Sequence, residues 1–72
     1  MARSKEIIRE ELEETRGRLK MYLAQEKKML EGGIQAYGIG SRNLQRYQMD
    51  LANIQSIIRS LKEQIRELES EL

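Results

Sequence analysis

The apolar residues in the second half of the chain recur at alternating steps of three and four. This is the spacing of a heptad repeat, in which one stripe of a helix faces a partner helix. Charged residues between them, such as Arg66 and Glu67, would lie on the outer face. The pattern therefore predicts one helix over residues 44–72, about 40 Å long at the usual helical rise. Its stripe consists of Leu44, Tyr47, Leu51, Ile54, Ile58, Leu61, Ile65, Leu68 and Leu72.

The first half of the chain repeats the same spacing less regularly and predicts a helix over residues 4–31. Ser4 can cap its N-terminus, because a serine side chain accepts a hydrogen bond from a backbone N–H of the first turn. Gly32 and Gly33 can end it, since glycine tolerates the left-handed conformation common just past a helix. The stripe consists of Ile8, Leu12, Thr15, Leu19, Tyr22, Glu26 and Met29. Its two polar members either set the register against a partner or lie half exposed.

The two stripes predict a pair of antiparallel helices whose apolar residues meet, within one chain or between chains. A second stripe of apolar residues, formed by Ile7, Leu23, Leu30 and Ile57, would stay uncovered when the two helices pair, and it predicts that the protein forms oligomers. The alternative is ordinary partial exposure of scattered apolar side chains. We call the following residues the helix seam: Ile8, Leu12, Leu19, Tyr22, Leu51, Ile54, Ile58, Leu61, Ile65 and Leu68.

The segment between the helices, residues 34–44, predicts a short β-hairpin. Gly40 and Ser41 suit the two central positions of a type II′ turn, where glycine comes first because that position needs a positive φ. Folding around this turn would place Tyr37 opposite Leu44 and Ile39 opposite Arg42. The predicted fold class is thus all-α with a small β element: two long antiparallel helices joined by a two-stranded β-hairpin, in a single domain over residues 1–72.

Composition excludes several kinds of site. The sequence has no cysteine and no histidine, so disulfides and the commonest zinc ligands are absent. The same absence removes the usual nucleophiles and general bases, so we expect neither an enzyme nor a cofactor. The acidic cluster Glu10, Glu11, Glu13 and Glu14 has nothing nearby in the sequence to desolvate it and is best interpreted as a solvated helix face.

Charge adds little that would select a partner. There are 13 basic and 12 acidic residues, for a net charge of +1, so no strong field draws the chain to nucleic acid or a membrane. The connector is locally basic, because it contains Arg42 and Arg46 and no acidic residue occurs from Gly32 to Met49. Together with Tyr37 they could form a contact for single-stranded nucleic acid, which combines basic and stacking side chains. Two arginines and one tyrosine make a small platform for that purpose. The charged N-terminus lacks a signal-peptide core, which favours synthesis in the cytoplasm.

The segment "QAYGIGSRNLQR" resembles a motif of small prophage-encoded structural proteins, the W-type head–tail joining (head-completion) family of lambda-like phages. The matching residues are Gln35, Tyr37, Ile39, Gly40, Arg42, Leu44 and Arg46. The motif covers about a dozen residues, and the order helix, hairpin, helix covers nearly the whole chain. Two residues depart from the family pattern: Gln45 replaces a threonine and Gln48 replaces an acidic residue, so a helix-capping box is lost and Asn43 would cap the second helix instead.

The resemblance implies a structural role in the virion, made in the bacterial host cytoplasm. Such proteins form a ring of copies beneath the portal and present a surface to the tail-joining protein. The partners expected here are therefore further copies of the chain and portal or tail-joining proteins, with no membrane, no small-molecule substrate and no specific nucleic acid. Tyr37, Ile39, Arg42 and Arg46 are the expected partner interface. Alternatives are a generic coiled-coil adaptor, which leaves the hairpin unexplained, and a small nucleic-acid-binding helical hairpin.

Overall fold

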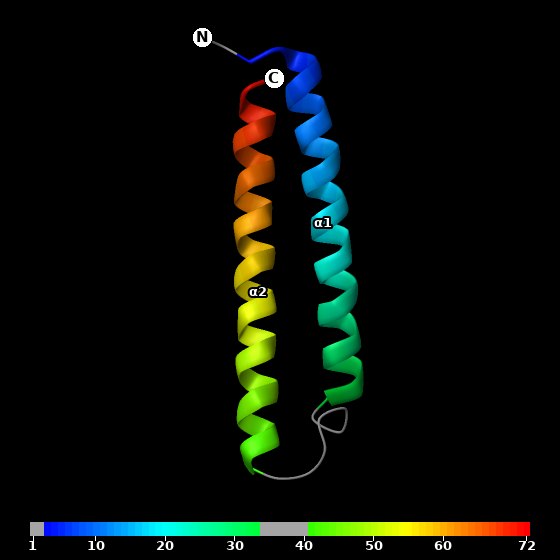
Figure 1. The fold of residues 1–72 in the computed structure, drawn as a ribbon, viewed down its shortest axis with the longest axis vertical. Coiled ribbons are helices and arrows are strands. Elements are labelled where there is room, and N and C mark those ends of the chain that lie inside the picture. The colour runs from blue at the N-terminus through cyan, green and yellow to red at the C-terminus, as the bar shows by residue number, and fades with distance from the viewer. Residues whose placement is uncertain (1–2, 34–40) are drawn as a thin grey trace.

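The computed structural model describes residues 3–33 and 41–72, with the side chains of 41 and 42 excepted. It contains two long helices, α1 (Lys5–Gly32) and α2 (Ser41–Ser70). They run antiparallel and side by side along almost their whole length, so that the two ends of the chain lie at the same end of the molecule (Figure 1). We call that end the terminal end and the opposite one the connector end. The molecule measures 53 × 17 × 12 Å along its principal axes.

The ends of α1 follow from its sequence, as predicted. The Oγ atom of Ser4 accepts a hydrogen bond from the backbone N–H of Ile7 at 3.2 Å, which satisfies one of the free donors of the first turn. Glu6 adds a negative charge where the helix dipole favours one. At the other end Gly33 adopts φ 57°, a conformation that costs little only for glycine, and its N–H donates to the carbonyl of Met29.

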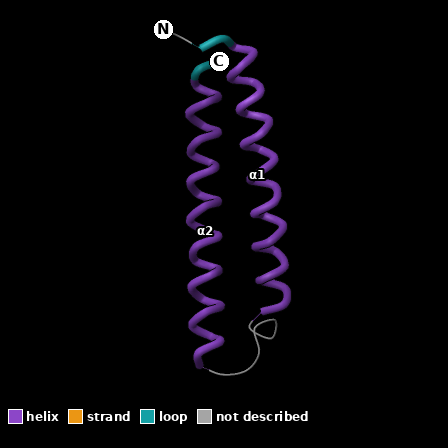
Figure 2. Tube along the Cα trace, in the orientation of Figure 1, coloured by secondary structure: helices purple, strands orange, loops and turns teal. Residues whose placement is uncertain are grey.

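The predicted β-hairpin over residues 34–44 is wrong. α2 already begins at Ser41, so Arg42 and Leu44, predicted to lie on a strand, are helical, and Asn43 lies inside the helix instead of capping it. Figure 2 shows no strand in the described part of the chain. The physical reason is that each residue added to an existing helix gains a hydrogen bond without a new nucleus, whereas an isolated two-stranded hairpin is marginal in water. Residues 34–40, which include Tyr37, Ile39 and Gly40, lie outside the described residues.

The helix seam pairs α1 with α2 inside one chain. Its residues form two clusters: Ile8, Leu12 and Leu68 near the terminal end, and Ile54 and Ile58 with Met29 toward the connector end. Burying one such aliphatic side chain stabilises the fold by about 1.5–3 kcal/mol. The buried seam residues are Ile8, Leu12, Ile54, Ile58, Leu61 and Leu68, and the half-buried ones are Leu19, Tyr22, Leu51 and Ile65.

The two polar residues of the α1 stripe behave differently. Thr15 is buried, with only 5% of its surface exposed, and its hydroxyl donates to the carbonyl of Glu11 at 2.7 Å. Threonine is accommodated in the core because this bond within its own helix leaves no unsatisfied polar atom. Glu26 is half-buried, and no hydrogen bond or ion pair to it is found among the described residues. Thr15 is therefore a satisfied core residue, whereas the carboxylate of Glu26 has no partner in that part of the chain.

Candidate functional site

The structure describes two of the four residues predicted to form the partner interface. Tyr37 and Ile39 lie outside the described residues. Arg42 lies in the first turn of α2, and Arg46 lies one turn further along and is exposed. The two arginines are therefore presented by the start of a helix and not by the tip of a hairpin.

The connector end of the helix pair is held by a side-chain hydrogen bond. The hydroxyl of Tyr47 on α2 donates to the backbone carbonyl of Met29 on α1 at 3.1 Å, and the tyrosine ring packs against the cluster of Met29, Ile54 and Ile58. The carbonyl of Met29 also accepts the N–H of Gly33. The last turn of α1 is thus fixed against the second turn of α2, close to where Arg46 is exposed.

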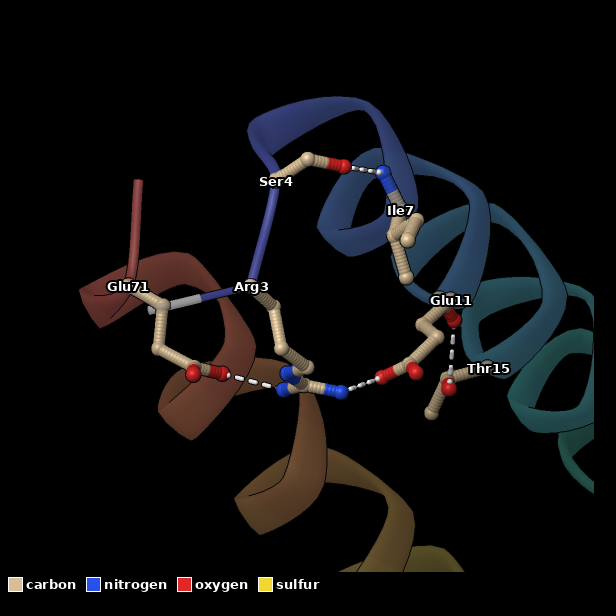
Figure 3. Close-up of polar contacts among 6 residues, drawn as sticks. All are labelled: Arg3, Ser4, Ile7, Glu11, Thr15 and Glu71. Atoms are coloured by element: carbon tan, nitrogen blue, oxygen red, sulfur yellow. Dashed lines mark hydrogen bonds and ion pairs between the residues drawn. The ribbon is translucent and has the colours of Figure 1, made fainter. Parts of the chain in front are cut away.

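The terminal end is held by charged side chains (Figure 3). The guanidinium of Arg3 donates to a carboxylate oxygen of Glu11 at 2.5 Å and to one of Glu71 at 2.6 Å. These hydrogen bonds, first to Glu11 and then to Glu71, raise the pKa of Arg3 above its ordinary value. Arg16 on α1 and Glu69 on α2 make a contact between the helices themselves at 3.4 Å. All of these side chains are well exposed, and such pairs contribute little to stability.

A groove with a volume of about 390 Å³ lies beside the Arg3 contacts at the terminal end. Its lining is mostly charged, with two arginine and four glutamate side chains. No group of three or more possible metal ligands occurs in the described part of the chain. Arg3 already bridges two of the carboxylates, and the groove holds no evident nucleophile beside a base. The residues lining it are Arg3, Glu11, Glu14, Thr15, Arg18, Gln64, Glu67, Leu68 and Glu71.

The apolar residues outside the helix seam do not form one surface, contrary to the prediction. Leu23 and Leu30 follow Arg16 at steps of seven, so they share the edge of the helix pair on which Arg16 meets Glu69. Ile57 instead precedes Glu71 by two such steps and lies on the opposite edge, where Arg3 bridges to Glu71. Ile7 belongs to neither row.

Three members of this apolar set are exposed, Leu30 at 55%, Ile7 at 47% and Leu23 at 38% of their surfaces, and of these Leu23 and Leu30 share one edge. Two methionines that sequence reasoning did not single out are more exposed still, Met21 and Met49 at 72% each. Both methionines fall outside the predicted stripes, and this position in the sequence pattern could have identified them as exposed. The contact of Arg3 with Glu71 had no such signal, because the two residues are 68 positions apart.

Among the described residues, no helical stretch has the length and apolar character needed to cross a membrane. Comparison with known proteins identifies the family of the chain but not its function. The chain belongs to the family of unknown function DUF6148, whose model matches residues 1–72. No curated protein and no solved structure matches the chain.

Proposed function

Because this family has no assigned activity, we propose a function from the structure itself: the protein is a structural subunit that acts by assembling with other chains. The observation that carries this proposal is the large surface of the single chain. It exposes 5864 Å² at a mass of 8.5 kDa. A compact monomer of that mass typically exposes about 4,700 Å². The excess of about 1,200 Å² is comparable to what one partner contributes to a stable interface, about 800 Å².

The core supports the same proposal. No side chain of the described residues is fully buried, and the buried apolar set comprises Ile8, Leu12, Met29, Ile54, Ile58, Leu61 and Leu68. A two-helix pair has a single contact face, so most of each helix remains in water. Small scaffolds without disulfides or metals commonly gain the missing burial by oligomerisation. The absence of cysteine makes disulfides unavailable to this chain.

The assembly we propose is a phage head–tail connector, with several copies arranged around a portal. The support for this specific assembly is the resemblance of residues 35–46 to the W-type motif. The proposed contact to the portal or tail-joining protein is revised by the fold, because Arg42 and Arg46 are carried by the start of α2. Arginine often dominates interface energetics, and the positive charges of these two residues would favour an acidic partner surface.

Two measurements test the two levels of this proposal. Sedimentation equilibrium of the purified chain at about 10–500 μM should give a mass of at least two chains, and a single-chain mass throughout this range would overturn the structural-subunit proposal.

For the connector, mass spectrometry of purified phage particles from a strain carrying the gene should detect the protein in several copies per particle. Particles that lack the protein would overturn the connector proposal and leave the general one standing.

A further inference from the structure

The edge of the helix pair that carries Leu23 and Leu30 differs between its two halves. At the terminal end, the rows that border this edge are charged: Arg9 and Arg16 on α1, Lys62 and Glu69 on α2. Toward the connector end the same rows continue, at steps of seven, with Leu23 and Leu30 on α1 and with Gln48 and Gln55 on α2. This half therefore has exposed leucines beside uncharged amides. Depletion of charge around an apolar centre is typical of the core of a protein interface.

Glu26 and Lys27 lie between the two leucines in the sequence and flank this edge on opposite sides. Glu26 belongs to the stripe that faces α2 and is half-buried without a hydrogen-bond or ion-pair partner among the described residues. Lys27 lies on the outer side, with a long contact of 3.9 Å to Glu31, and both of these side chains are mostly exposed. A half-buried carboxylate without a partner and an exposed lysine therefore border the same leucines.

We propose that a second copy of this chain docks on the edge formed by Leu23 and Leu30, with the two α1 helices parallel and related by a two-fold axis. This inference rests on the proposed structural function and specifies its first contact. The surface area supports a second copy as the occupant, because the excess over a compact monomer, about 1,200 Å², is more than the roughly 800 Å² that each partner contributes to an ordinary interface. A second copy also supplies the same leucines, as a two-fold interface requires.

The charges select the parallel arrangement. In an antiparallel pair, the two-fold axis places the same flank of each copy side by side. Lys27 would then approach Lys27 of the second copy, and Glu26 would approach Glu26. In a parallel pair, the two-fold axis places the Lys27 flank of each copy beside the Glu26 flank of the other. Lys27 of each copy therefore approaches Glu26 of its partner. The half-buried carboxylate then gains a partner of opposite charge, whereas the antiparallel pair places like charges together. Leu23 meets Leu23 and Leu30 meets Leu30.

Cross-linking tests the arrangement, because the chain has no cysteine of its own. Leu23→Cys and Leu30→Cys should each oxidise to a disulfide-linked dimer, since each position faces its own copy at the axis. A mixture of the two variants should give the two homodimers. Met49→Cys, on an outer face and exposed at 72%, is the control and should remain largely unlinked. A 23–30 heterodimer as the main product would overturn the parallel arrangement, and linkage no faster than that of Met49→Cys would overturn the docking site.

Dimer dissociation constants test the site without a cross-link. Leu30→Glu should weaken the dimer by at least about 30-fold, because each dimer loses two apolar contacts, whereas Met49→Glu should change it less than about threefold. Glu26→Lys alone should weaken the dimer several-fold, and adding Lys27→Glu should restore it. If the unchanged chain is a monomer, both this inference and the proposed function fail. If the chain assembles but Leu30→Glu assembles equally well, this inference alone fails.

Discussion

Tyr47 acts through two parts of its side chain, each with its own energetic contribution. Its ring packs against the cluster of Met29, Ile54 and Ile58, and its hydroxyl donates to the carbonyl of Met29. The spacing of apolar residues placed Tyr47 on the stripe of the second helix, but it held no information on the hydrogen bond. Tyr22 packs against the same cluster from α1, and no hydrogen bond of its hydroxyl is found among the described residues. The two tyrosines therefore make a matched pair.

Replacing Tyr47 with Phe should lower the free energy of unfolding by about 1 kcal/mol, because the ring stays and one hydrogen bond is lost. Replacing Tyr22 with Phe should change it by less than about 0.5 kcal/mol, since only an unbonded hydroxyl is removed. Urea denaturation of the two variants, followed by circular dichroism at one protein concentration, gives both values. Equal losses would show that the bond from Tyr47 to Met29 contributes nothing.

At the scale of elements, the heptad spacing predicted both long helices because their stripes meet across a single contact face. The ends of α1 were predictable as well, since Ser4 and Gly33 have local roles that no tertiary contact overrides. The start of α2 was not, because Gly40 and Ser41 suit a turn as well as a helix start. The first residue of α2 depends on how far a long, packed helix extends toward the N-terminus. The turn preferences of neighbouring residues do not determine this. The contacts of Arg3 and Arg16 were unpredictable because they depend on the pairing of distant residues.

Gly17 tests how α1 tolerates a residue with poor helix propensity. A Cβ added there would meet no atom within 4 Å, and its φ is not positive. Gly17→Ala should therefore raise the free energy of unfolding by about 1 kcal/mol, because alanine loses less backbone freedom on folding. Gly33→Ala is the control: it also has open space but a φ of 57°, so it should destabilise the fold. Thermal unfolding of both variants measures the difference. Destabilisation by Gly17→Ala would mean that another chain approaches this face closely.

At the scale of the whole molecule, the fold is long and narrow. Its radius of gyration is 16.3 Å, against about 11 Å for a compact domain of this length. A larger surface for the same mass leaves less apolar area to oppose chain entropy, so stability and assembly are expected to be linked. The same geometry explains why the site is a surface and not a pocket. Two helices have a single contact face, so the features left for recognition in the described part of the chain are the edges and the ends of the pair.

Linkage between folding and assembly predicts that the melting temperature depends on protein concentration. If two chains unfold together, a tenfold rise in concentration stabilises the dimer by about 1.4 kcal/mol. For two chains of this length that corresponds to roughly 4–5 °C. Differential scanning calorimetry between about 20 and 200 μM measures the shift. The melting temperature of the Leu30→Glu variant should depend less on concentration, because its dimer is weakened, whereas Met49→Glu should keep the full shift. A concentration-independent melting temperature for the unchanged chain would show that the helix pair is stable alone, and its exposed leucines would then have no role in folding.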